Sequence, residues 1–209
     1  MKGWTIPRCF EGRTVAVLAS GPSMSQRVAD AVHLAGVPAI AVNSTFRLAP
    51  WAWALYAADG AWWGHEANRD AHRFEGLRIS CEQVKGVHML HNAGPEGYTD
   101  DPGEINTHGN SGSQAMQIAI KTGAAKVLLC GFDMHQREAS HWHGDHPSPL
   151  RSTLAETYTV FIKRMERAAP LIARCGVDVV NCTPGSALRG FRASTLQDEI
   201  GAQAHNILV

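Results

Sequence analysis

The chain has 209 residues, of which 44% are apolar and 18% charged, which is typical of a globular protein with a sizeable core. Its formal net charge is zero and its isoelectric point is about 7.2, so the totals indicate neither a nucleic-acid-binding nor an anionic-membrane surface. Met1–Phe10 lacks the pattern of a signal peptide, and no apolar run approaches the roughly 18 residues of a membrane span.

The first stretch of the chain predicts a strand, a glycine turn and a helix, which is how nucleotide-binding βαβ units begin. Arg13–Ser20 is predicted as a buried strand and Gly21-Pro22-Ser23 as a tight turn. Ser23 or Ser25 is expected to cap a helix that runs to about Ala35. The turn is neither a GxGxxG nor a phosphate loop with its lysine, so an ordinary βα turn stays open as the alternative.

The next two predicted strands also end in polar residues. Val37–Val42 is followed by Asn43, and Trp51–Ala58 by Asp59. Because open α/β sheets bind ligands outside the carboxyl ends of their strands, Asn43 and Asp59 are candidate ligand contacts. A simple helix cap is the alternative role for Asn43.

The middle of the chain predicts a short helix, two short strands and a long loop. Trp62 and Trp63 begin the helix, and their rings are expected in the core or in an interface. Leu77–Cys81 and Val87–His91 are the strand candidates. The Gly- and Pro-rich residues 92–109 form a flexible loop that could fold over the site, because loops of that length are usually functional or mobile.

Residues 110–123 predict a capped helix. Asn110 or Ser111 can cap it, apolar residues then recur at helical spacing, and Gly123 can end it. A helix start with small residues such as Ser111 and Gly112 suits an anion such as phosphate.

A wholly apolar strand follows this helix. Val127–Cys130 is expected to be buried on both faces of the sheet, and Gly131 and Asp133 follow at its carboxyl end. The loops at both ends of this helix and strand therefore have the composition of a binding site.

The His-rich segment 134–149 contains the main catalytic candidates, His141, His143 and His146, with Asp145 between them. Histidine suits proton transfer near neutral pH, so a general base is the first interpretation. Imidazole and carboxylate also bind zinc or iron, but the spacing matches no common metal pattern and we assign no metal ligand. Structurally hydrogen-bonded loop histidines are the third alternative.

The last part of the chain predicts a long amphipathic helix, which Pro170 kinks or ends, and then a final buried strand at Val177–Asn181. Residues after about Thr195 form a short helix or a tail. The apolar face of the long helix comprises Leu150, Leu154, Tyr158, Phe161, Ile162 and Met165.

Taken together, these elements predict one α/β domain over residues 1–209, a Rossmann-like variant whose sheet is mostly parallel and has helices on both faces. The sequence has no GxSxG elbow, catalytic cysteine signature or paired-glutamate pattern, which disfavours a hydrolase. A transferase needs only donor-phosphate binding and one base, so it is compatible with the sequence.

In their order along the chain, these motifs resemble a superfamily that includes the bacterial lipooligosaccharide sialyltransferases and the archaeal-type 6-hydroxymethylpterin diphosphokinases. The similarity runs from about Thr14 to Phe191 and is greatest to small bacteriophage-encoded members. It implies a nucleotide bound at the strand carboxyl ends and a transferase that uses a nucleotide-activated donor, such as a CMP-linked sugar.

In residue terms, the resemblance implies that Gly21, Pro22, Ser23 and Asn43 contact the nucleotide, with Asp59 as the polar residue after the third strand. It implies that Ser111 and Gly112 touch the donor phosphate or ribose. The catalytic base would be His146, with His143 as the second choice.

Two features depart from the sialyltransferase pattern. Residues 134–140 contain no tyrosine where those enzymes have two, and His108 stands where they have an arginine. The diphosphokinases use ATP with magnesium, so a magnesium-dependent enzyme is an alternative in which Asp59, Asp133 and Asp145 could hold the ion. The other alternative is a phage protein that binds a nucleotide or metabolite without catalysis.

The expected partner is a small-molecule nucleotide donor, with the acceptor left open. The five scattered cysteines, without a CxxC pair, are typical of reduced thiols in a cytoplasmic protein, here the host cytoplasm if the chain is phage-encoded. Exposed tryptophans would favour a homo-oligomer.

Overall fold

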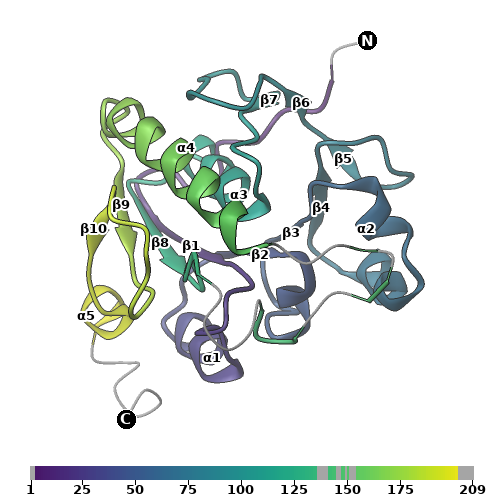
Figure 1. Cartoon of the computed structure of the whole chain (residues 1–209), viewed down its shortest axis with the longest axis horizontal. Coiled ribbons are helices and arrows are strands. Elements are labelled where there is room, and N and C mark those ends of the chain that lie inside the picture. Colours follow the sequence, from purple (N-terminus) through teal and green to yellow (C-terminus); the bar gives the residue numbers. More distant parts are fainter. Residues whose placement is uncertain (1–2, 136–140, 145–146, 149, 151–153, 202–209) are drawn as a thin grey trace.

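The computed structural model describes residues 3–135, 141–144, 147–148, 150 and 154–201, which form short strands and helices (Figure 1). Two short 3₁₀ helices, η1 (Asn43–Arg47) and η2 (Glu66–Arg73), lie between them. The strands are β1 (Thr14–Leu18), β2 (Ala39–Val42), β3 (Ala54–Tyr56), β4 (Leu77–Ser80), β5 (His88–Met89), β6 (His91–Asn92), β7 (Glu104–Ile105), β8 (Lys126–Cys130), β9 (Asp178–Asn181) and β10 (Arg192–Ala193). The α-helices are α1 (Gln26–Leu34), α2 (Gly60–Gly64), α3 (Ser111–Lys121), α4 (Ala155–Ala173) and α5 (Leu196–Ile200).

Eight of these strands form one sheet, in the order β10-β9-β8-β1-β2-β3-β4-β5. Every strand pair in it is parallel. The strand order runs outward in both directions from the β1–β8 pair, so the topological switch point of the sheet lies between these two strands. Ligands of doubly wound sheets bind at such a point, outside the strand carboxyl ends.

The central strands are buried on both faces, and each face has its own core. Val15 and Val17 of β1 point to the face that α3 and α4 cover. Ala16 and Leu18 alternate with them and point to the face covered by α1, α2 and α5. This arrangement confirms the predicted α/β class, with a mostly parallel sheet and helices on both faces.

Two predicted elements are wrong in detail. Val87–His91 is not one strand, because β5 joins the large sheet whereas β6 pairs with β7 in a separate two-stranded sheet. Pro170 does not end the long helix, since α4 continues to Ala173. The last turn of α4 places Ile172 in the core at 1% exposure, and this burial offsets the hydrogen bond that Pro170 cannot donate.

The start of the long helix also differs from the prediction. The apolar face was expected to begin at Leu150, but α4 begins at Ala155, with Leu154 in the capping position. Leu154 is 62% exposed, and Leu150 packs against the core of the other sheet face. Neither leucine therefore belongs to the buried stripe of α4.

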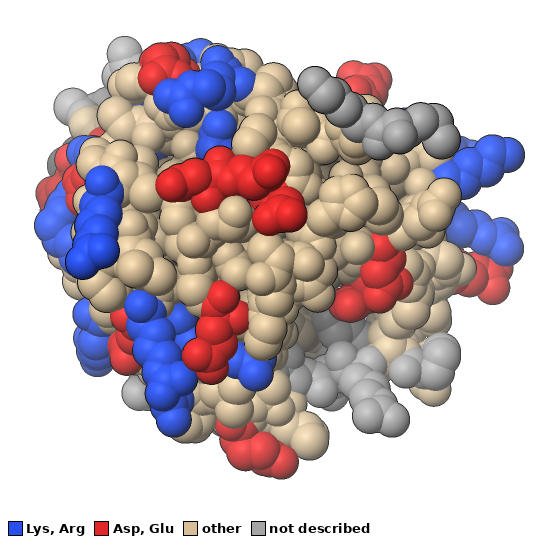
Figure 2. All heavy atoms as spheres, turned by 90° about the horizontal axis from the view of Figure 1, so that it is seen from above, with Lys and Arg blue, Asp and Glu red and all other residues tan. Residues whose placement is uncertain are grey.

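Surface charge agrees with the zero net charge. On the face of the molecule in Figure 2, basic and acidic side chains are interspersed over the part that the structure describes. Within the same part of the chain, no helix combines the length and the apolar character that crossing a bilayer requires.

Candidate functional site

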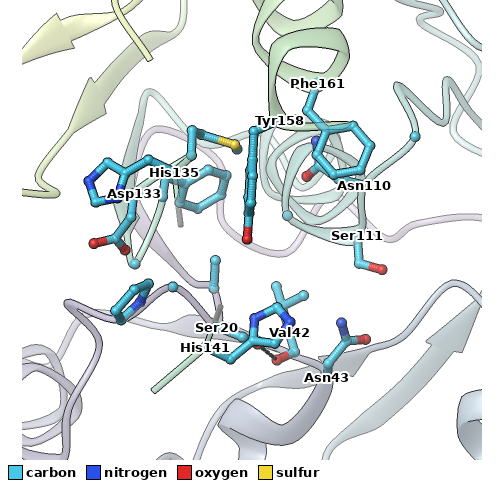
Figure 3. Close-up of a pocket in the computed structure, with 18 of the residues that line it drawn as sticks. Ser20, Val42, Asn43, Asn110, Ser111, Asp133, His135, His141, Tyr158 and Phe161 are labelled. Carbon is cyan, nitrogen blue, oxygen red and sulfur yellow. Dashed lines mark hydrogen bonds between the residues drawn. The ribbon is translucent and has the colours of Figure 1, made fainter. Parts of the chain in front are cut away.

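A cleft of about 850 Å³, its open mouth included, lies at the switch point between β1 and β8. Its walls come from the loops after β1, β2, β3 and β8, from the start of α3 and from α4 (Figure 3). Nine of the predicted site residues line it: Gly21, Pro22, Asn43, Asp59, Asn110, Ser111, Gly112, Asp133 and His141.

Three other predicted site residues do not line the cleft in the described structure. Ser23 lies behind it and hydrogen-bonds Asp133. His143 stacks on His141, with 5.2 Å between the ring centroids and 20° between the planes. His146, the base implied by the resemblance, lies outside the described residues, as does Asp145.

The wall between β1 and β8 consists of two loops that are in direct contact. The backbone N–H of Gly21 donates to Gly131 O at 3.0 Å. Ser23 donates to the two carboxylate oxygens of Asp133, from its backbone N–H at 3.1 Å and from its hydroxyl at 2.9 Å. A Cβ atom at position 21 would lie 2.0 Å from Asp133 Oδ2, so the loops can meet only because residue 21 is glycine.

The N-terminus of α3 forms the opposite wall. Of the two predicted caps, Asn110 is the one used: its side-chain oxygen accepts the Ser113 N–H at 2.8 Å. The N–H groups of Ser111 and Gly112 stand in the first turn, where a helix offers no carbonyl partner. They carry the partial positive charge of the helix start, which makes this wall suitable for an anion.

Asp59 and Asp133 are the acidic residues of the cleft, and its lining among the described residues contains neither lysine nor arginine. Burial, together with the nearby Glu82 carboxylate, raises the pKa of Asp59. Asp133 is only 4% exposed. An anionic ligand would therefore depend on backbone N–H groups rather than on cationic side chains.

Backbone strain is concentrated around this site. Among the described residues, the non-glycine residues with positive φ are Asn43, His108 and Met134, at 49°, 47° and 56°. Asn43 and Met134 both line the cleft. Left-handed backbone at non-glycine residues costs energy and is often found at functional sites.

The histidine-rich segment is attached to the cleft through Trp142. Its backbone N–H donates to Ser20 O and its indole N–H donates to Thr45 Oγ1, both at 3.1 Å. The Thr45 hydroxyl in turn donates to Ala19 O at 3.2 Å. These contacts, called the Trp142 clamp below, fix His141 at the mouth of the cleft.

Two aromatic side chains of α4 complete the site, and sequence reasoning missed them. Tyr158 and Phe161 were assigned to the apolar packing face of the long helix, yet both line the cleft. Figure 3 shows the Tyr158 ring reaching down into the cleft with its hydroxyl toward the side formed by Asn43 and His141. The hydroxyl group of Tyr158, on an otherwise apolar stripe, is the one signal that could have indicated this role.

The segment 92–109 contributes little to the cleft lining, which includes only Gly109 of it. Its polar groups bond to α3 and to the segment itself. The Asn106 backbone pairs with the Gln117 side chain in both directions, at 3.1 and 2.7 Å. His108 is fully buried and contacts Ser113 Oγ through Nδ1 and Gly97 O through Nε2.

Within the described ranges, no three His, Cys, Asp or Glu side chains lie close enough together to hold a metal ion. No protein-family model matches the sequence, and the search of curated proteins found no match. Fold and geometry together define an α/β protein with a Rossmann-like sheet and a cleft at its switch point.

Proposed function

We propose that the protein is a transferase that binds a nucleotide-linked donor in the switch-point cleft, with His141 as the general base. The observation that carries this proposal is the convergence of four strand-end loops and the start of α3 on one cleft. Such a crevice is where doubly wound sheets take nucleotides. The sequence resemblance described above supports the same class.

The donor phosphate would bind at the start of α3. The N–H groups of Ser111 and Gly112 provide hydrogen bonds and the positive end of the helix dipole, equivalent to about half a charge. With two carboxylates and no lysine or arginine in the described lining, the site favours a donor with one phosphate over a free triphosphate. Asn43 and Asp59, on neighbouring loops, offer amide and carboxylate groups to the base and ribose.

His141 would take the proton of the acceptor hydroxyl. As that proton moves to the imidazole, the hydroxyl oxygen forms a bond to the donor group and the nucleotide phosphate departs with the electrons of the broken bond. His141 is preferred here because it lines the cleft and the Trp142 clamp holds it there. Tyr158, whose side chain carries a hydroxyl group, lines the same cleft as His141.

A magnesium-dependent ATP enzyme is the second candidate, because Asp59 and Asp133 both line the cleft. Magnesium is commonly held by one or two carboxylates together with substrate phosphates. Both Asp133 oxygens already accept hydrogen bonds from Ser23, which leaves Asp59 as the better ligand. Most ligands of the ion would therefore have to come from the substrate and from water.

Nucleotide binding can be tested with a thermal-shift panel of cytidine, CMP, CDP, AMP and ATP, each with and without magnesium. Binding to the folded state alone raises its stability by about 2.7 kcal/mol at a hundredfold excess over Kd. Stabilisation by CMP but not by cytidine, without metal, supports the proposal. Stabilisation by AMP or ATP only with magnesium favours the second candidate.

Substitutions at Ser111 test the phosphate site. Ser111→Asp adds a carboxylate at the helix start, where it stabilises the helix by about 0.3–1 kcal/mol but repels a phosphate. We expect CMP affinity to fall more than tenfold without a loss of melting temperature, whereas Ser111→Ala should change both only slightly. No shift with any nucleotide, or equal CMP affinity in Ser111→Asp, would refute the nucleotide-binding proposal.

A further inference from the structure

A second cavity lies behind the loop that follows β8, on the sheet face covered by α1 and α5. It measures about 770 Å³ including its mouth. Val28 of α1 and Leu196 of α5 form its sides, and Cys130 and Cys182 line it at the ends of β8 and β9. The helix that connects β8 to β9 is α4, which packs on the opposite face, so this part of the sheet is covered by α1 and the short α5.

The lining of this cavity is uncharged. Unlike the cleft, it includes no aspartate, glutamate, lysine, arginine or histidine among the described residues. Cys182 follows β9 and its N–H donates to Leu129 O at 2.9 Å, so the ladder extends and sets Cys182 beside Cys130. Burial raises the pKa of the Cys130 thiol, and that of Cys182 to about 12, which keeps both thiols neutral.

Two of its polar side chains are already used within the protein. The Ser23 hydroxyl donates to Asp133, and the Thr195 hydroxyl donates to Asp198 while accepting the Asp198 N–H. A ligand rich in hydrogen-bonding groups would therefore lose hydration without full compensation. An apolar molecule gains by contact with Val28, Leu196 and the two thiols.

The cavity and the switch-point cleft share one wall. Gly131 lines both, and Ser23 lines the cavity while it hydrogen-bonds Asp133 of the cleft. A molecule in the cavity therefore contacts the back of the two loops whose front forms the cleft.

We propose that this cavity is a binding site for a small, uncharged, largely apolar molecule, whose occupancy changes ligand affinity in the cleft through the Ser23–Asp133 wall. A small molecule is the occupant because the site is a concave hollow between two helices and not a flat surface. The effect on the cleft rests on the proposed function, whereas binding to the cavity does not. The coupling is reciprocal, so a cleft ligand changes affinity in the cavity by the same factor.

Occupancy can be tested by methyl NMR of the full chain with toluene, and with benzoate as a charged control of similar size. We expect toluene to cause saturable chemical-shift changes of the Val28 and Leu196 methyl groups. The affinity for benzoate should be at least tenfold lower. Leu196→Trp should abolish the shift changes by filling the cavity, and the exposed Leu171→Trp on α4 should not. Val28→Phe serves as a second filling variant if Leu196→Trp does not fold.

Three results would overturn the site. These are the absence of saturable shifts, shifts that persist in both filling variants, and toluene binding that occurs only after residues 202–209 are deleted. The last would mean that the end of the chain itself occupies the cavity.

Coupling can be measured by titrating CMP with and without saturating toluene. We expect the Kd for CMP to change about fivefold or more, and the change to shrink in Ser23→Ala, which removes the hydroxyl bond to Asp133. An unchanged Kd would overturn the coupling. If no nucleotide binds at all, the proposed function fails, but the toluene experiment still decides the cavity.

Discussion

The two polar segments that flank the cleft look alike in sequence but serve different purposes. Residues 92–109 and 134–149 each contain two prolines and many polar residues, and they lead into or out of the central helix and strand. The first buries two of its polar residues, Asn106 and His108, which bind α3 and the segment itself. The second contributes Met134, His135 and His141 to the cleft.

This difference shows that composition does not separate a loop that binds within the fold from one that lines the cleft. His108 is buried, and both its ring nitrogens have partners within the fold. His141 lies at the cleft, and its position depends on the neighbouring Trp142. Substitutions in the first segment should therefore reduce stability, and substitutions in the second should reduce turnover.

The largest effect is expected from His141→Gln, which removes the proposed base. Turnover should fall about a thousandfold, within the usual range for general-base catalysis, with little change in nucleotide affinity or melting temperature. The readout is release of the nucleotide that binds in the panel, from a donor in which that nucleotide is linked to a sugar. His143→Gln is the matched control and should cost less than tenfold, and His146→Gln tests the base that the resemblance implies. Wild-type turnover in His141→Gln would contradict the assignment.

His108→Asn should have the next largest effect, and it should act on the fold. Asparagine tolerates the positive φ at this position, so the variant isolates the loss of the imidazole contacts. Leaving Ser113 and Gly97 without their buried partner should lower the free energy of unfolding by about 2 kcal/mol, measured by urea denaturation. The exposed His91→Asn should change it by less than about 0.5 kcal/mol. Equal losses in the two variants would erase the distinction between the segments.

A smaller effect is expected from the Trp142 clamp. Trp142→Phe keeps an aromatic ring but removes the indole N–H that donates to Thr45. Such a hydrogen bond contributes about 1 kcal/mol net. Turnover should fall about tenfold while nucleotide affinity stays the same. Thr45→Val removes the acceptor of the same bond. The loss of turnover in the double variant Trp142→Phe/Thr45→Val should therefore be smaller than the product of the two single losses. Full additivity would mean that the bond does not position the segment.

The smallest effect concerns pH. Burial is the main cause that lowers the pKa of His108 below its ordinary value of 6.5. Below pH 6.5 the unfolded chain binds a proton at His108 that the folded chain does not bind. The contribution of the neutral His108 to stability is therefore complete above pH 6.5 and is lost as the pH falls toward the pKa of the folded state. The slope is at most about 1.4 kcal/mol per pH unit. Urea midpoints from pH 7.5 to 5.5 should fall more steeply in the wild type than in His108→Asn, and parallel curves would contradict this.

The sequence was sufficient for the fold and for nine of the residues that line the cleft, because both depend on local patterns. Apolar runs that end in glycine or polar residues predict buried parallel strands, and parallel strands place Gly21, Asn43, Asp59 and Asp133 at one edge whatever the details of packing. Asn110 was identified for a similarly local reason, since a cap depends on residues three positions away.

What the sequence did not predict depends on contacts between distant segments. The inward position of Tyr158 depends on how α4 crosses the sheet, and helical periodicity alone cannot distinguish a core contact from a cleft contact. The bond between Trp142 and Thr45 joins residues 97 positions apart, and the bond between Ser23 and Asp133 joins residues 110 positions apart. The continuation of α4 through Pro170 likewise depends on the tertiary burial of Ile172.

The position of β1 in the sheet has a consequence for synthesis on the ribosome. β1 pairs with β2 on one side and with β8 on the other, and β8 at residues 126–130 emerges long after β1 at residues 14–18. Until then the nascent chain can pair β1 through β5, but it carries an open, wholly apolar strand edge that invites association with other chains. The wall of the cleft forms only when that edge closes, so a chain released before Asp133 lacks both the protection and the site.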